Sequence, residues 1–258
     1  MSLPRNVVIK MGGSTFGATD TTYEDIVRIS EMGIAPIVVH GGGADVNTWL
    51  DKLGIEAEFS KGLRITNADT LEVAIAVLSG LLNKKIVTAI QRAGGNAVGI
   101  SGLDHATIIA KINDQALGLV GTVEEVNPTL LRIIMEQGII PVISPISLTS
   151  FPEHQIVNVN ADTIAGEIAN YLTSDLVIFL TDVPGVLNKD GKVISNIYSD
   201  EVDALIENKI IVGGMIPKVQ ASVRAIHNTQ MAKIVDGLRP HALIEALDGK
   251  SGTTILRR

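Results

Sequence analysis

The chain has 258 residues, 46 % of them hydrophobic and only 3 % aromatic, so aliphatic side chains must fill a sizeable core. Its formal net charge is −7 and its basic residues form no block, which argues against a nucleic-acid-binding surface. It has no cysteine, which excludes disulfides and thiolate metal sites, and no apolar run of about 20 residues, so we expect a cytoplasmic protein without a membrane span.

Short Val- and Ile-rich segments alternate with segments of helical periodicity along the first two thirds of the chain. In chain order we predict a strand at 6–9, a helix at 22–32, a strand at 34–39, helices at 44–53 and 70–93, a strand at 97–100, a helix at 128–137, a strand at 139–146 and a helix at 162–172.

The same alternation continues to the C-terminus. We predict a strand at 175–180, a hairpin at 186–197 around an Asp-Gly turn, helices at 200–208 and 216–227, a strand at 231–235, a helix at 240–247 and a strand at 253–256. This pattern predicts an α/β fold with an open, mostly parallel central sheet that helices cover on both faces. No Pro-, Gly- or Ser-rich linker divides the chain, and we place a lobe boundary near Ser174.

Two predicted strands end in glycine-rich turns, Lys10-Met11-Gly12-Gly13 and His40-Gly41-Gly42-Gly43. Ligands of open parallel sheets bind at the carboxyl ends of strands, where glycine lets the backbone approach a phosphate or carboxylate. One such turn is often only a tight connection, but two favour an anion site. Neither turn matches Gly-x-Gly-x-x-Gly, and the chain contains no P-loop motif.

Three cations are candidates for that site, each with a plainer alternative. Lys10 directly follows a buried strand, where a lysine is either functional or reaches past the sheet edge to solvent. Lys218 lies near a predicted helix start, a position equally suited to a solvated helix face. Arg64 matches a carboxylate fork better than lysine does, although it could be an ordinary surface residue.

Polar residues flank two further elements. Asn158, Asn160 and Asp162 precede a helix, where Asn160 or Asp162 could simply be the N-cap. Asp182 follows the strand predicted at 175–180, so it belongs either to the ligand-bearing edge or to an ordinary turn. The five histidines show no metal-ligand spacing, and we expect His40, the one beside a candidate site, either to support the site residues from behind or to pack in the core.

Together these motifs resemble the amino acid kinase family over nearly the whole chain, and most closely its members that act on N-acetylglutamate. The glycine turns and Thr181-Asp182-Val183 are typical of the wider family. The more specific motifs are Gly62-Leu63-Arg64-Ile65-Thr66 and Asn158-Val159-Asn160-Ala161-Asp162, and Gly214-Met215-Ile216-Pro217-Lys218 completes the match.

The resemblance implies a three-layer αβα sandwich with an N-terminal lobe, residues 1–174, that binds the amino acid and forms a dimer. Residues 175–258 would form the nucleotide-binding lobe. The implied activity is ATP-dependent phosphorylation of the side-chain carboxylate of N-acetyl-L-glutamate to N-acetylglutamyl 5-phosphate, a step of arginine biosynthesis. Mg²⁺ would be held mainly by the nucleotide phosphates, with no protein metal ligand.

The resemblance also implies roles for individual residues. Lys10 and Lys218 would stabilise the transferring phosphoryl group, with Asp162 holding both lysines in place. Gly42, Gly43, Arg64 and Asn158 would bind the amino acid. The nucleotide would contact Lys10, Gly12, Gly13, Asp182, Val183, Pro184, Gly185, Val186, Leu187, Ile210, Ile211, Val212 and Lys218.

One departure from the motifs of the kinases that act on N-acetylglutamate leaves the identity of the substrate undecided. Gly102-Leu103-Asp104-His105 and residues 121–127 look more like the related kinases of carrier-bound aminoadipate. Kinases of aspartate, carbamate, uridylate or glutamate are further alternatives, and a non-catalytic amino-acid sensor is a remote one. The resemblance also implies that arginine-inhibited members carry an extra N-terminal helix, which links dimers into hexamers. Because Lys10 lies so near the first residue, no such helix fits here, and we expect a homodimer insensitive to arginine.

Overall fold

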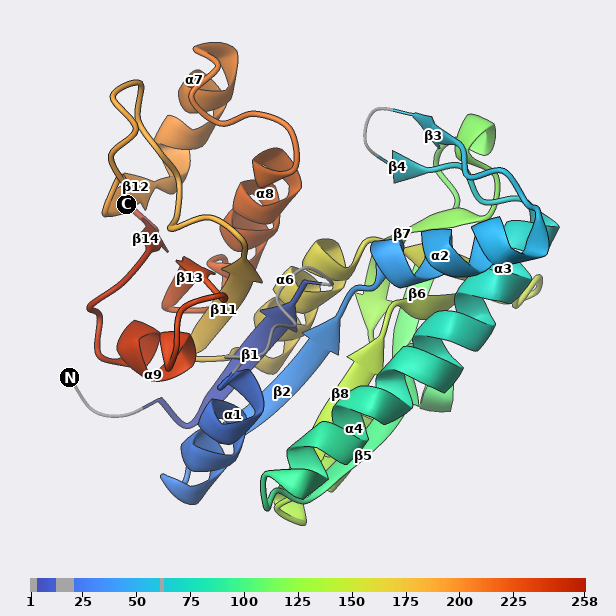
Figure 1. The fold of residues 1–258 in the computed structure, drawn as a ribbon, viewed down its shortest axis with the longest axis horizontal. Coiled ribbons are helices and arrows are strands. Elements are labelled where there is room, and N and C mark those ends of the chain that lie inside the picture. Colours follow the sequence, from blue (N-terminus) through green and yellow to red (C-terminus); the bar gives the residue numbers. More distant parts are fainter. Residues whose placement is uncertain (1–3, 13–20, 61–62) are drawn as a thin grey trace.

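The computed structural model describes residues 4–12, 21–60 and 63–258, so the predicted site residue Gly13 and the motif residue Gly62 lie outside the described part. Its main sheet has eight strands in the order β12-β14-β13-β11-β1-β2-β8-β5, and all neighbours are parallel except β13 and β14 (Figure 1). The strands are β1 (Asn6–Met11), β2 (Ala35–His40), β5 (Ala97–Ser101), β8 (Ile140–Ser144), β11 (Leu176–Thr181), β12 (Asn196–Tyr198), β13 (Met231–Asp236) and β14 (Thr253–Leu256).

The central strands are buried on both faces, as their unbroken aliphatic runs predict. Successive side chains of β1 enter different cores, because side chains of a strand alternate between the faces of the sheet. Val8 packs in one hydrophobic cluster with Phe179, whereas Val7 and Ile9 pack in another. The expected three-layer α/β arrangement is therefore confirmed.

Helices cover both faces of this sheet (Figure 1). One face carries α1 (Thr22–Glu31), α2 (Gly43–Leu53), the continuous run of α3 (Ala68–Ala74), the π-helix η2 (Ile75–Leu82) and α4 (Asn83–Arg92), and α9 (Ala242–Leu247). The other carries α5 (Thr129–Glu136), α6 (Ala161–Leu172), α7 (Val202–Glu207) and α8 (Met215–Ala225).

The sequence predicts no membrane span, yet among the described residues one helical run is long and apolar enough to be a candidate. Ala68–Arg92 is 25 residues long and apolar enough to cross a bilayer. Leu82, Ile86 and Ile90 of this run are nevertheless buried in the core against the sheet. The run is thus weak evidence for a membrane span, because helices that cover a core can be equally long and apolar.

A small second sheet was not predicted. Four short strands form a closed barrel: β6 (Ile108–Lys111), β7 (Val120–Val126), β9 (Ile146–Thr149) and β10 (Ile156–Val159). The single strand predicted at 139–146 is wrong in this respect, because the chain leaves the main sheet after Ser144 and enters the barrel at Ile146. A two-stranded ribbon, β3 (Phe59–Ser60) and β4 (Leu63–Arg64), and the 3₁₀ turns η3 (Asp104–Ala106), η4 (Gln115–Leu117) and η5 (Ser199–Glu201) complete the described elements.

The hairpin predicted at 186–197 is only partly correct. Its turn forms, with the Asn188 N–H donating to the Lys192 carbonyl and a bridge between Leu187 and Val193. The Ile194 N–H also donates to the Val186 carbonyl, but from Ser195 onward the chain pairs with β14, where Ile197 of β12 lies beside Ile255. The main sheet runs without a break across Ser174, with β1 between β2 and β11, and the lobe boundary stays a prediction.

Candidate active site

One carboxylate lies between two lysines that are far apart in the sequence. Lys10 Nζ is 2.9 Å from Asp162 Oδ1, and Lys218 Nζ is 3.5 Å from Asp162 Oδ2. The side chains of Lys10 and Asp162 are only 8 % and 6 % exposed, so their pairing occurs largely away from water. The structure thus brings together the two lysines predicted to stabilise the phosphoryl group and the aspartate predicted to hold them.

Each member of this group is placed by the end of a regular element. Lys10 lies near the carboxyl end of β1, and Lys218 lies in the first turn of α8 and also donates to the Gly214 carbonyl over 3.3 Å. Asn160 is the N-cap of α6, with its side-chain oxygen accepting from the N–H of Asp162 and of Thr163. The capping alternative is therefore confirmed for Asn160, which leaves the Asp162 carboxylate free to face the lysines.

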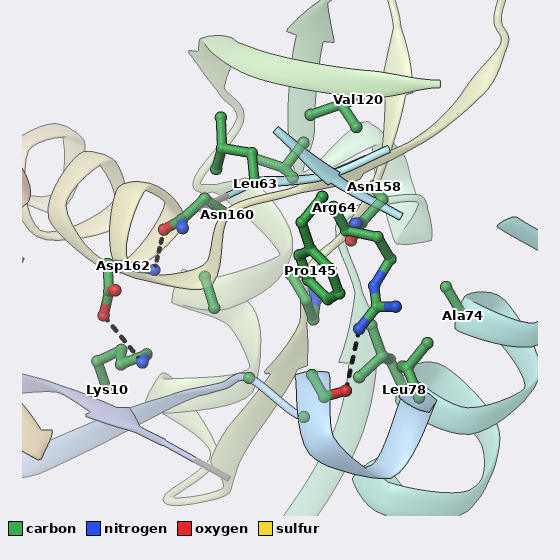
Figure 2. A pocket seen from close by; sticks show the side chains of 17 residues that line it. Lys10, Leu63, Arg64, Ala74, Leu78, Val120, Pro145, Asn158, Asn160 and Asp162 are labelled. Atoms are coloured by element: carbon green, nitrogen blue, oxygen red, sulfur yellow. Dashed lines mark hydrogen bonds and ion pairs between the residues drawn. The ribbon is translucent and has the colours of Figure 1, made fainter. Parts of the chain in front are cut away.

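A cavity of about 270 Å³ opens beside this group (Figure 2). Its polar wall contains Lys10, Asp162, Arg64 and Asn158, together with the glycine turn after β2. Its apolar wall, which the sequence did not indicate, comes from Val46, Phe59, Leu63, Ala74, Leu78, Val120, Pro145, Val159 and Ala161. A ligand with both an anionic end and a short apolar group matches such a lining.

Arg64 extends from β4 toward the first turn of α2 (Figure 2). Its Nη2 donates to the Gly43 carbonyl at 3.0 Å, and its guanidinium lies over the Phe59 ring. Its Nη1 is buried without a hydrogen-bond partner, and burial lowers the pKa of this guanidinium from its usual value. A buried donor without an acceptor is costly, so a ligand oxygen here would relieve that cost.

The glycine turn after β2 presents backbone donors to the same cavity. Gly42 is the N-cap of α2, and among the described residues no hydrogen bond uses the N–H of Gly42 or Gly43 as donor. A Cβ on Gly42 would lie 2.5 Å from Leu82 and 2.7 Å from Leu78, and its φ of +150° is also unfavourable for other residues. The backbone conformation therefore favours glycine at this position, and any side chain would also displace the ends of the two leucines.

The predicted nucleotide segments lie at the carboxyl end of β11 and near α8, outside the cavity described above. Asp182 accepts a hydrogen bond from Thr181, and the Val186 N–H donates to Thr253. The side chains of Val186 and Ile211 are buried in the core, whereas Val212 is exposed. The remaining members of these segments are Val183, Pro184, Gly185, Leu187 and Ile210.

The segments that resemble the aminoadipate kinases lie elsewhere. Asp104 accepts hydrogen bonds from Ser101, and Asn127 donates to the His105 carbonyl, both near the barrel. None of residues 102–105 or 121–127 lines the cavity that contains Arg64 and Asn158. Their departure from the pattern therefore does not alter the described wall of this cavity.

A protein-built metal site is not found among the described residues, which contain no group of three or more His, Cys, Asp or Glu side chains able to hold an ion. Both oxygens of Asp162 face lysines. Mg²⁺ often binds chiefly through nucleotide phosphates, a mode that does not need such a group.

Comparison with known proteins identifies the family. Residues 5–236 match the amino acid kinase family. The acetylglutamate kinase of Dehalococcoides mccartyi is 41 % identical, with 96 % of this chain and 93 % of the relative covered. That of Paracoccus denitrificans is 42 % identical, with 98 % and 84 % covered.

A solved structure agrees in fold. The crystal structure of smu.665 from Streptococcus mutans UA159 has a TM-score of 0.85 and 26 % identity, and the match covers 98 % of each chain. The expected resemblance is confirmed by the family match and by the relatives across nearly the full length. This chain belongs to the amino acid kinase family.

Proposed function

We propose that this chain is an ATP-dependent acetylglutamate kinase, which phosphorylates the side-chain carboxylate of N-acetyl-L-glutamate in arginine biosynthesis. The observation that carries the proposal is the shared carboxylate of Asp162, which lies within 3.5 Å of both Lys10 and Lys218 at the edge of a cavity containing Arg64. Relatives about 40 % identical over nearly the whole chain, each an acetylglutamate kinase, support the same activity.

The nucleophile of this reaction needs no general base. A glutamate side chain has a solution pKa of about 4.3, so its carboxylate is already ionised at neutral pH. The barrier arises because this anion must approach the γ-phosphate of ATP. Catalysis of phosphoryl transfer comes mainly from positioning and charge stabilisation, which the ammonium groups of Lys10 and Lys218 supply.

Asp162 acts as the organiser of the two ammonium groups. Without a counter-ion, two lysines in one largely buried site would repel each other. The carboxylate keeps both near the reacting atoms until phosphate oxygens arrive. Gly42 and Gly43 add backbone N–H groups, at the N-terminus of an 11-residue helix, that favour negative charge.

Arg64 and Asn158 bind the α-carboxylate end of the substrate. The partnerless Nη1 of Arg64 is one donor for that carboxylate, and the Asn158 amide lies on the same cavity wall. The apolar wall, including Phe59 and Leu63, accommodates the acetyl methyl group. Unacetylated glutamate would place a charged ammonium against that wall, which disfavours it.

Residues beyond the cavity hold the nucleotide. We assign the ATP phosphates to Lys10, Gly12, Gly13 and Lys218, and the rest of the nucleotide to residues 182–187 and 210–212. When bound to the phosphates, Mg²⁺ supplies additional neutralisation of their charge. We further propose a homodimer located in the cytoplasm, for which one oligomeric species of twice the chain mass in light scattering is the check.

An acceptor panel tests the function. ADP release is measured with N-acetyl-L-glutamate, glutamate, aspartate, carbamate and a carrier-bound aminoadipate, each at matched concentration. We expect kcat/KM to be highest for N-acetyl-L-glutamate by at least about 100-fold, because a site built for one polar arrangement rejects others strongly. Preference for the carrier-bound acceptor would reassign the substrate, and turnover with none of the acceptors would indicate the sensor alternative.

A further inference from the structure

We propose that His40 is a positioning residue for phosphoryl transfer: its ring Nδ1–H holds the Gly41 carbonyl so that the next N–H, that of Gly42, faces the cavity. The inference rests on the proposed kinase function and assigns a task to a residue that the sequence places only in general terms beside the site. Both ring nitrogens of His40 have polar partners.

The two partners determine which ring nitrogen carries the proton. His40 Nδ1 is 2.8 Å from the Gly41 carbonyl oxygen, and Nε2 is 3.2 Å from Asn83 Nδ2. A carbonyl can only accept and an amide NH₂ can only donate. The Nδ1–H tautomer of neutral histidine therefore satisfies both contacts at once, whereas the Nε2–H tautomer satisfies neither.

The orientation of the Asn83 amide is itself supported by its other contacts. Its Nδ2 also donates to the Val142 carbonyl over 2.9 Å and lies 3.3 Å from the Ile100 carbonyl. Its Oδ1 accepts from Lys84 Nζ at 2.9 Å. Exchanging the oxygen and nitrogen of this amide would set oxygen against two carbonyls and an ammonium against NH₂, so the orientation is well determined.

The charge state of His40 agrees with this assignment. The side chain is 0 % exposed, and this burial lowers its pKa to about 4 from the ordinary 6.5. The Gly41 carbonyl opposes that shift, while the ammonium groups of Lys84 and Lys10 add to it. At neutral pH the ring is uncharged and has one proton to donate.

Holding the Gly41 carbonyl orients the following N–H. In a planar trans peptide the C=O of one residue and the N–H of the next point in opposite directions. The Gly41 N–H donates to the Met11 carbonyl at 2.9 Å, and the Gly42 carbonyl accepts from the Val46 N–H at 3.0 Å. With both ends held, the His40 contact selects the peptide orientation that presents the Gly42 N–H to the cavity.

A glycine turn particularly needs such support. Gly41, Gly42 and Gly43 all line the cavity, and glycine backbone samples many conformations. A donor that is already oriented costs no reorganisation when charge develops on the transferring group. Loss of the His40 contact would let the Gly41–Gly42 peptide rotate and remove that donor.

A matched pair of variants tests the proposal. In His40→Asn the new Nδ2 is attached to Cγ, as Nδ1 is in histidine, so it can still donate to the Gly41 carbonyl. In His40→Gln the amide is one bond longer and lies where Nε2 was, so contact with Asn83 remains but the donor to Gly41 is lost. The variants are compared in kcat and in KM for N-acetyl-L-glutamate, with thermal unfolding of each measured in parallel.

We expect His40→Gln to lower kcat by roughly 100-fold with KM changed by less than about threefold, because one transition-state donor is lost. His40→Asn should retain kcat within about fivefold. Equal kcat in His40→Gln and wild type, or equal loss in both variants, would overturn the proposal. A wild type that does not phosphorylate N-acetyl-L-glutamate would instead refute the underlying function.

The tautomer of the wild-type protein provides a test that needs no variant to fold. Nitrogen-15 NMR of labelled histidine distinguishes a protonated from an unprotonated ring nitrogen. We expect His40 to be protonated at Nδ1 and unprotonated at Nε2 at neutral pH. Protonation at Nε2 would leave the ring unable to donate to Gly41 and would refute the inference regardless of the kinetic results.

Discussion

Arg64 and Gly43 connect two sides of the cavity: the Arg64 Nη2 donates to the Gly43 carbonyl across 3.0 Å. The contact joins the ribbon of β3 and β4 to the first turn of α2, directly after the glycine turn. The other terminal nitrogen, Nη1, has no partner and is buried. One guanidinium therefore fixes the geometry of the site and still has a donor left for substrate.

Arg64→Lys should raise KM for N-acetyl-L-glutamate by roughly 10–100-fold and lower kcat much less. Lysine keeps the charge but has one nitrogen in place of the planar fork, so it does not reproduce the geometry in which one nitrogen bonds Gly43 and the other a ligand carboxylate. Steady-state kinetics at saturating ATP measure the effect. Arg92→Lys, at the end of α4, is the matched control and should not alter KM. An unchanged KM in Arg64→Lys would remove Arg64 from substrate binding.

Lys218→Ala should lower kcat by about 100–1000-fold while the protein remains folded. The lost ammonium is one of the two that neutralise charge on the transferring phosphoryl group. Lys192→Ala, which removes an exposed lysine, should retain wild-type turnover. Circular dichroism checks that the variant is folded, and ADP release measures kcat. A folded Lys218→Ala enzyme with near-normal kcat would exclude this lysine from the mechanism.

Gly42→Ala and Gly43→Ala should differ sharply despite being adjacent. A Cβ at Gly42 would meet Leu82 and Leu78 and would sit on a backbone of positive φ, whereas a Cβ at Gly43 would have its nearest neighbour, Arg64, at 3.9 Å. We expect Gly42→Ala to lower the free energy of unfolding by about 1–3 kcal/mol and to reduce kcat.

Gly43→Ala should change the free energy of unfolding by less than about 0.5 kcal/mol. Urea titration of both variants gives the comparison. Equal stability of the two alanine variants would contradict the close packing of η2 against the turn.

His40 should make stability depend on pH in mildly acidic solution. Burial lowers its folded-state pKa to about 4, while the unfolded chain keeps a value near 6.5. Between these values the unfolded chain binds a proton that the folded chain does not, so stability rises with pH and is lost as pH falls from 6.5 to 4. The contribution across this window is about 3 kcal/mol.

The difference between wild type and His40→Asn isolates this contribution from that of other groups. Urea unfolding at several pH values should show a shallower decline for the variant between pH 6.5 and 4. Identical pH slopes for the two proteins would mean that residue 40 does not titrate differently on folding.

Much of the main sheet could be predicted from the sequence because its strands are buried on both faces. β1 and β11 contain the apolar runs Val7–Ile9 and Leu176–Leu180, each followed by polar or glycine residues, and such segments are recognisable without knowing their neighbours. The barrel strands β9 and β10 have only four residues each, too few for a periodic pattern to separate them from loops.

The candidate site likewise contains residues that the sequence could predict and residues that it could not. Lys10, Asp162 and Lys218 could be selected because each follows a strand or begins a helix in a recognisable motif. The apolar wall could not, because Phe59, Pro145 and Val120 have no common spacing and meet only through the packing of the ribbon, the barrel and the helical run.

By itself the sequence determined the α/β alternation, the glycine turns and the charged residues available for an anion site, because these depend on local composition and periodicity. Only the tertiary structure decided that one carboxylate would serve two lysines and that a buried histidine would hold a glycine carbonyl. The physical reason is that both arrangements depend on distances between groups that are far apart in the sequence. The crossover connections of the parallel sheet and the packing of its helices establish those distances.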